Sequence, residues 1–164
     1  MISLLLTLLF STTFAQVFNP RQETLQTAIS CPPIFNPDDL AQAIRDSNTP
    51  LVKCFLDKNN IVNEKDSSAY SPLIWATYKG FDEIVNILVD KGCDVNTLDP
   101  HGNSAVIMAS KIGHNKIIMT LVDKGADIFT TNDEGLNALY YARATGNDLL
   151  AVFLMQKGLR WNNS

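Results

Sequence analysis

The feature that most constrains this chain is a phrase that recurs at a fixed distance. The residues GFDEIVNILVDKGCDVN begin at Gly80, and GHNKIIMTLVDKGADIF begins 33 residues later, at Gly113. The same step divides most of the chain into four blocks, which are residues 33–65, 66–98, 99–131 and 132–164. A period of this length is typical of proteins built from stacked supersecondary units.

Two columns show what the blocks preserve. One position is alanine in every block (Ala43, Ala76, Ala109 and Ala142). Another is large and apolar in every block (Phe55, Leu88, Leu121 and Leu154). A small side chain lets helices approach closely, and the large ones supply a core. The columns therefore predict repeated helix packing.

The second block shows the expected structure of one repeat. Pro72 suits the first turn of a helix, and Gly80 suits its left-handed end. Asp82 and Glu83 favour the start of a second helix, which Gly92 ends. Each block is predicted to be a helix, a turn, a helix and a hairpin loop. Two short helices cannot bury both of their apolar faces alone, so neighbouring blocks must stack.

These motifs resemble the ankyrin repeat family, whose first helix usually opens with a Thr-Pro-Leu-His run. The equivalents here are SPLI at residues 71–74, SAVI at 104–107 and NALY at 137–140. The family's inter-helix Gly-His pair is present as Gly113 and His114, and its Gly-Ala-Asp motif as residues 125–127. In the first block, Ser47 and Asn59 replace the two glycines.

The resemblance covers residues from about 36 to 162. It implies an all-α solenoid of four stacked ankyrin-like helix-turn-helix repeats joined by β-hairpin loops, with the first and last repeats acting as caps. Trp161 is expected to close the C-terminal end of the stack.

The first residues differ in kind from the repeats. Residues 2–10 form an apolar run that is too short to cross a bilayer as a helix. Thr13 and Ala15 then occupy the small positions that a signal peptidase reads, so residues 1–15 are predicted to be a signal peptide. No basic residue precedes the run, and a buried N-terminal helix is the alternative. Residues 16–35 are interpreted as a leader over the first repeat and residues 36–164 as the repeat domain.

Other chemistry finds little support in the sequence. The net charge is −4 and no stripe of Lys or Arg occurs, which argues against a nucleic-acid partner. His114 lies in an inter-helix turn, where a structural role is expected, and His101 at a loop tip either contacts a partner or is simply solvated. No catalytic residues, metal ligands or cofactor are predicted, and no membrane span after the signal peptide.

The three cysteines have different expected roles. Cys93 takes the place of Ala126 in the next block, so a buried free thiol is expected. In an exported chain, Cys31 and Cys54 either form a disulfide that attaches the leader to the first repeat or remain two unpaired thiols.

In the ankyrin family, the hairpin tips and the exposed side of the first helices form a concave surface that binds other proteins. Transferring this surface by column nominates Tyr70, Tyr78, Lys79, Leu98, His101, Asn103, Lys111, Ile112, Asp133, Glu134 and Leu136, with Ser67, Ser68 and Pro100 on the same tips. Tyr70, Tyr78, Ile112 and Leu136 are expected to be exposed in a free monomer, although scattered surface hydrophobic residues are also normal. Trp75 and Tyr141 are assigned to the layer between helices.

The resemblance implies a non-enzymatic protein-binding module. Because export is expected, the periplasm is the favoured location and secretion the alternative. Some exported bacterial ankyrin proteins resemble inhibitors that protect the producer from its own cell-wall hydrolases. An immunity-type inhibitor of an extracytoplasmic enzyme is therefore expected, with a stabiliser of a periplasmic enzyme, or an effector that binds a host or prey protein, as alternatives.

Overall fold

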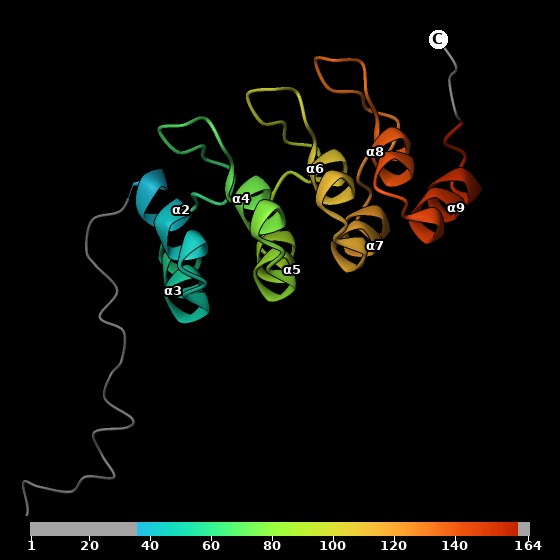
Figure 1. The fold of residues 1–164 in the computed structure, drawn as a ribbon. Coiled ribbons are helices and arrows are strands. Elements are labelled where there is room, and N and C mark those ends of the chain that lie inside the picture. The colour runs from blue at the N-terminus through green and yellow to red at the C-terminus, as the bar shows by residue number, and fades with distance from the viewer. Residues whose placement is uncertain (1–35, 161–164) are drawn as a thin grey trace, which may run out of the picture. The chain divides into compact units, whose positions relative to one another are not determined.

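The computed structural model describes residues 36–160, which form eight α-helices in four consecutive pairs (Figure 1). The pairs are α2 (Pro37–Arg45) with α3 (Thr49–Lys58), α4 (Pro72–Lys79) with α5 (Asp82–Asp90), α6 (Ala105–Ile112) with α7 (Asn115–Asp123), and α8 (Ala138–Ala144) with α9 (Asp148–Gln156). The predicted all-α repeat architecture is confirmed.

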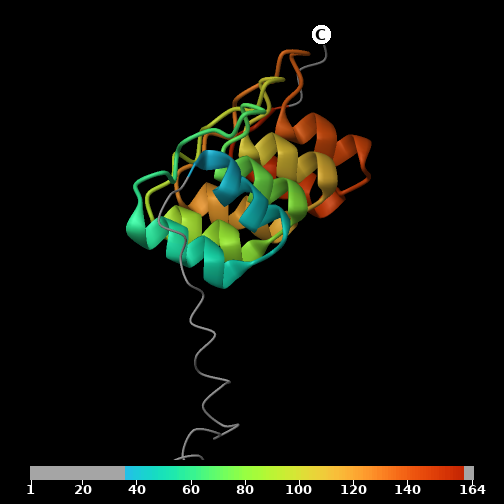
Figure 2. The same ribbon diagram turned by 90° about the vertical axis from the view of Figure 1, so that its left-hand side faces the viewer.

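The pairs stack in chain order. The first helices pack in the series α2, α4, α6 and α8, while α3, α5 and α7 form a second layer beside them. The long loops after α3, α5 and α7 project from the same side of the stack (Figures 1 and 2). Each long loop leads into the first helix of the next pair. The loops and first helices together therefore form one long surface on this side of the stack.

Side-chain caps explain where the first helices begin. In every repeat a side-chain oxygen of the N-cap residue accepts a hydrogen bond from the backbone N–H three residues further on. The four N-cap residues are Asn36, Ser71, Ser104 and Asn137. Such a cap satisfies one of the free N–H groups of the first turn. Helices α6 and α8 therefore start at the equivalent position although they lack the proline of α4.

Left-handed residues explain where the first helices end. Gly80 and Gly113 cap α4 and α6 with φ of 74° and 91°, which glycine adopts without strain. Ser47 takes the same conformation after α2, with φ of 55°. Asn59, in the column of Gly92, is extended instead, with φ of −138°. The first repeat therefore leaves its second helix by a different path from the later repeats.

The predicted columns form the core. The four column alanines are at most 3% exposed, as are the four large residues of the second helices, from Phe55 to Leu154. They belong to one hydrophobic cluster that continues through all four repeats. The expected helix packing is confirmed by this burial.

The loops are tight hairpins with little regular strand pairing. Within residues 36–160 the ladder is reduced to one isolated antiparallel bridge, between Leu98 and Ser104. Each loop is organised by a buried Asp or Asn, which is Asp66, Asp99 or Asn132. Its Oδ1 accepts hydrogen bonds from the backbone N–H groups two and four residues further on. The side chain acts together with one backbone hydrogen bond across each turn, from the N–H of Asp66, Asp99 and Asn132 to the carbonyl oxygens of Tyr70, Asn103 and Leu136.

Further side chains connect each repeat to the next at a constant spacing. Asn63 accepts the backbone N–H of Asp94 at 2.7 Å, and Asn96 accepts that of Asp127 at 2.8 Å. Ion pairs join Lys91 to Asp57 and Lys124 to Asp90 in the same way. The repeated DKG sequence is therefore part of the architecture.

Several expectations concern residues outside the described range. The signal peptide (residues 1–15), the leader (residues 16–35) and Trp161 lie there. Cys31 lies there as well, so its pairing with Cys54 stays a prediction. Cys93 is described, and it is a buried free thiol. Between residues 36 and 160, no helix has the length and apolar character needed to cross a membrane.

Candidate protein-binding surface

Among residues 36–160, the loops and first helices line two hollows. The first, here called the aromatic hollow, has a volume of about 290 Å³ and is lined by Ser68, Tyr70, Trp75, Tyr78 and Met108. The second, here called the polar hollow, also measures about 290 Å³ and is lined by His101, Asn103, Lys111, Asn132, Asp133, Glu134 and Tyr141. Together they are called the binding face below.

The two hollows are the same place in successive repeats. A step of 33 residues converts four lining residues of the first into lining residues of the second, namely Ser68 into His101, Tyr70 into Asn103, Tyr78 into Lys111 and Met108 into Tyr141. The backbone arrangement is thus repeated while the chemistry changes from apolar to charged.

Three aromatic rings form one wall of the aromatic hollow. The Trp75 ring centroid lies 5.1 Å from that of Tyr70 and 6.1 Å from that of Tyr78, the latter pair edge to face. Such tilted and edge-to-face arrangements are favourable for aromatic rings. Tyr78 keeps 50% of its surface exposed, so an aromatic ring remains available to a partner.

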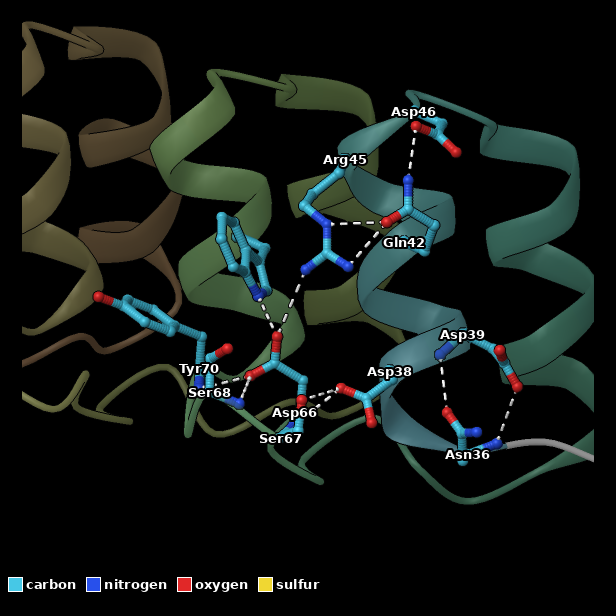
Figure 3. A network of polar contacts seen from close by, with 11 residues as sticks. Asn36, Asp38, Asp39, Gln42, Arg45, Asp46, Asp66, Ser67, Ser68 and Tyr70 are labelled. Atoms are coloured by element: carbon cyan, nitrogen blue, oxygen red, sulfur yellow. Dashed lines mark hydrogen bonds and ion pairs between the residues drawn. The ribbon is translucent and has the colours of Figure 1, made fainter.

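The Asp66 carboxylate holds Trp75 in place, and its contacts with Arg45, Ser68 and Tyr70 can be followed in Figure 3. Its Oδ2 accepts the indole Nε1–H of Trp75 at 2.8 Å and lies 3.4 Å from Nη1 of Arg45, while its Oδ1 accepts the backbone N–H groups of Ser68 and Tyr70. The carboxylate is buried and its charge is offset by hydrogen bonds and by the guanidinium. One side chain therefore fixes both the loop and the indole.

A second carboxylate attaches the same loop to the first repeat. Oδ1 of Asp38 on α2 accepts the backbone N–H of Ser67 at 2.9 Å and its hydroxyl at 2.7 Å (Figure 3). These hydrogen bonds, led by the backbone one, favour the ionised form and lower the pKa of Asp38. The loop that carries Tyr70 is thus held from both repeats.

Amide groups organise the polar hollow. Nδ2 of Asn132 donates to the hydroxyl of Tyr141 at 3.1 Å and to Oδ1 of Asn103 at 3.0 Å. Nδ2 of Asn103 in turn donates to Oδ2 of Asp99 at 2.9 Å. Asn103 is buried although it lines the hollow, and its predicted contact with a partner stays a prediction. It links two successive loops.

Three cations lie over aromatic rings on this side of the stack. Their side-chain charges are 4.8 Å (Arg45 over Trp75), 5.5 Å (Lys111 over Tyr141) and 5.8 Å (Lys79 over Tyr78) from the ring centroids. These distances are within the range of cation–π attraction. Arg45 and Lys111 are separated by two repeats and make equivalent contacts, so the pattern follows the repeat.

The exposed charges of the polar hollow are two carboxylates and one ammonium group. Asp133 and Glu134 lie on the loop before α8, and the ion pairs found among residues 36–160 involve neither of them, nor Lys111. The local formal charge is therefore −1 if His101 is neutral. The aromatic hollow has no charged residue in its lining.

The predicted apolar residues are exposed to different degrees. Tyr78 and Ile112 are 50% and 40% exposed, as expected. Tyr70 and Leu136 are only half-buried, because Tyr70 packs on Trp75 and both residues follow the buried turn residue of their loop. The expectation that Tyr70 and Leu136 are exposed is therefore met only in part.

The predicted residues divide into three groups. Tyr70 and Tyr78 line the aromatic hollow, and His101, Asn103, Lys111, Asp133 and Glu134 line the polar hollow. Ser68 also lines the aromatic hollow. The remaining predicted residues line neither hollow, and all except Leu136 are exposed; they are Ser67, Lys79, Leu98, Pro100, Ile112 and Leu136.

Sequence reasoning missed part of the lining. Helix packing is the predicted role of Trp75 and Tyr141, yet they form walls of the two hollows, and the lining also includes Met108 and Asn132, which are outside the predicted set. Trp75, Met108 and Tyr141 stand 33 residues apart, in one column of large side chains. That column was the available signal.

A different group of apolar residues is exposed on the second helices. It comprises Met119 on α7 and Leu149, Val152 and Met155 on α9. Leu149 is 83% exposed. These residues line neither hollow, and they form the main competing candidate for a binding surface.

In the described part of the chain, no group of three or more His, Cys, Asp or Glu side chains is placed to hold a metal ion.

Comparison with family models identifies a match to ankyrin repeats (3 copies) over residues 21–99 and 92–164. Comparison with curated proteins finds no match.

Proposed function

This chain belongs to the ankyrin repeat family, whose members act as protein-interaction modules, and we propose that it works by covering part of another protein with its binding face. The observation that carries this proposal is the cluster of Tyr70, Trp75 and Tyr78, in which Tyr78 remains half exposed. Exposed aromatic side chains are enriched at the centres of protein interfaces, where they bury large areas at low entropic cost.

The size of the hollows supports a macromolecular partner. Each measures about 290 Å³, which is at or below the lower limit of about 300–1,000 Å³ for small-molecule sites. A hollow of this size accepts a side chain of a partner. Two hollows in a row therefore suit a protein surface better than one compact ligand.

We further propose that the partner is an extracytoplasmic enzyme and that the chain inhibits it by covering its cleft, as an immunity-type protein does for a self-produced cell-wall hydrolase. The support for export is the apolar run at residues 2–10 with Thr13 and Ala15 after it. The net charge of −4 would steer association with a basic partner. Stabilisation of a periplasmic enzyme, and secretion as an effector, remain alternative functions.

Capture of the partner tests the binding face. The tagged full-length chain is expressed in its own organism, beside two double variants, Tyr78→Ala with Ile112→Asp and Leu149→Asp with Val152→Asp. All four positions are exposed, so both variants are expected to fold, which circular dichroism checks. The first variant should lose the partner and the second should retain it. Loss with the second and retention with the first would place binding on α9.

Two further measurements separate the proposed roles. Cell fractionation with N-terminal sequencing determines whether residues 1–15 are removed and in which compartment the chain resides. The captured enzyme is then assayed for activity and thermal stability with and without the chain. Loss of activity supports inhibition, whereas a raised melting temperature with unchanged activity supports a stabilising role.

A further inference from the structure

We infer that the two hollows together bind an extended segment of the partner, with an apolar side chain, ideally aromatic, in the aromatic hollow and a basic side chain in the polar hollow. This inference rests on the proposed function and assigns the chemistry of the segment that the binding face recognises. Three observations carry it: the composition of the aromatic hollow, the charges of the polar hollow, and their separation by one repeat.

The aromatic hollow is prepared for an apolar side chain. Tyr70, Trp75, Tyr78 and Met108 line it together with Ser68, and its polar groups are the hydroxyls of Ser68 and of the two tyrosines. Trp75 is already fixed by Asp66, so little side-chain entropy is lost when a partner binds. The Met108 thioether is flexible and polarizable, so it adapts to the shape of an inserted ring.

The polar hollow favours a positive charge. Asp133 and Glu134 are exposed and unpaired among the described residues, and the nearby Lys111 already lies over the Tyr141 ring. The equivalent tip residues one repeat earlier are Pro100 and His101, and two repeats earlier Ser67 and Ser68. The two carboxylates are therefore peculiar to this hollow, where a Lys or Arg of the partner would complement them.

The spacing of the hollows selects the conformation of the segment. They are separated by one repeat, and packed helices lie about 8–10 Å apart. In a polyproline II segment, residues i and i+3 point to the same side and are separated by about 9.3 Å. A β-strand places same-side residues about 6.6 or 13 Å apart, which fits less well. We therefore assign the apolar and basic residues to positions three apart in a polyproline II segment.

Peptide selection tests this assignment. A phage library of random short peptides is selected on the full-length chain, and the binders are counter-screened on Tyr78→Ala. Binders that depend on Tyr78 should be enriched in an aromatic or large aliphatic residue and a Lys or Arg three positions away, in either chain direction. The best binder is then synthesised with its basic residue intact and with Glu in its place.

A charge reversal with a matched control supplies the second readout. Glu134→Lys should weaken the basic peptide by about tenfold and strengthen the Glu-containing peptide by a similar factor. Asp123→Lys makes the same charge change at an exposed position outside both hollows and should leave both affinities within about twofold. Equal responses of the two variants would reduce the effect to net charge and overturn the inference.

The outcomes distinguish the inference from the proposed function. Binders that need Tyr78 but show no preference for a basic residue, and that bind Glu134→Lys normally, overturn the inference and leave the binding face in place. If no binder needs Tyr78, or if the binders are lost with Leu149→Asp, both the inference and the proposed binding face are wrong.

Discussion

The turn residues Asp66 and Asn132 differ in one terminal group of the side chain, and in each case that group suits the neighbouring hydrogen-bond partners. Both accept two backbone N–H groups through Oδ1. At Asp66 the other oxygen faces two donors, the indole of Trp75 and the guanidinium of Arg45. In Asn132 an NH₂ group stands in place of the second carboxylate oxygen, and it donates to the Tyr141 hydroxyl. The repeat therefore fixes the turn, and the neighbouring ring determines whether acid or amide fits.

Asp66→Asn tests this matching at the residue scale. The amide oxygen keeps the two loop hydrogen bonds. The NH₂ group that replaces Oδ2 is a donor, so it cannot accept the hydrogen bonds of Trp75 and Arg45. We expect a loss of about 1–3 kcal/mol in the free energy of unfolding, measured by urea denaturation, and a change in tryptophan fluorescence. The control is Asp57→Asn, which removes one partner of an exposed ion pair and should cost less than about 1 kcal/mol. Equal stability of the two variants would contradict the proposed role of Asp66.

Cys93 provides a prediction about reactivity. Burial, followed by the nearby Asp94, raises the pKa of its thiol from 9.0 to about 12. At about pH 8 the thiolate fraction is therefore very small, and alkylation by iodoacetamide should be slow in the native chain and fast in guanidinium chloride. Mass spectrometry of the Cys93 peptide measures both rates. Similar rates in the two conditions would show that the thiol is accessible.

The same shift predicts a pH dependence. The folded state favours the neutral thiol of Cys93, so this contribution to stability is complete below pH 9.0 and is lost as the pH rises towards about 12. Cys93→Ala should remove that part of the alkaline loss of stability. The variant is a natural control because Ala126 occupies the same position in the next repeat.

At the scale of helices, the column of small residues sets how closely neighbouring repeats approach. Ala142 on α8 is fully buried, whereas Ala144 on the same helix is exposed. Helices α6 and α8 pack directly on each other, as do α8 and α9. A larger side chain at Ala142 must therefore displace a neighbouring helix, whereas one at Ala144 extends into solvent.

Ala142→Leu and Ala144→Leu form a matched pair for this prediction. Overpacking at Ala142 should lower the free energy of unfolding by about 1–3 kcal/mol. The same substitution at Ala144 should change it by less than about 0.5 kcal/mol. Thermal and urea denaturation measure both. An equal effect at the two positions would mean that helix propensity, rather than packing between repeats, determines the response.

The helices could be predicted more fully than the loops, for a physical reason. The alanine column and the left-handed glycines are local requirements that recur at every repeat, so the sequence displays them several times. Asn103 is different, because its burial depends on hydrogen bonds to Asp99 and Asn132 that a single column does not reveal. Trp75 likewise packs between helices and lines a hollow, and a pattern of apolar residues cannot separate the two roles.

On the scale of the whole molecule, position in the stack should determine how far a defect spreads. Leu88 and Leu154 occupy the same column and are both completely buried. Leu88 lies on α5, which packs against α3 and α7, whereas Leu154 lies on α9, at the end of the described stack. Repeat proteins are stabilised by nearest-neighbour contacts, so the consequences of the two defects differ.

Leu88→Ala and Leu154→Ala test this difference. Each should cost about 2–5 kcal/mol locally. With Leu88→Ala, hydrogen exchange should accelerate in the helices on both sides, α3 to α7. With Leu154→Ala, it should accelerate in α8 and α9 while α4 and α5 stay protected. Uniform acceleration throughout in both variants would show that the stack unfolds as one unit.

The bonds from Asn63 to Asp94 and from Asn96 to Asp127 have a consequence for how such a chain changes over generations. Because successive junctions use the same contacts, an extra copy of residues 66–98 placed directly after the original would meet matching neighbours at both ends. A single duplication would then lengthen the recognition surface by one complete hollow without disturbing the existing ones. New specificity would arise by adding a unit whose side chains are then free to diverge.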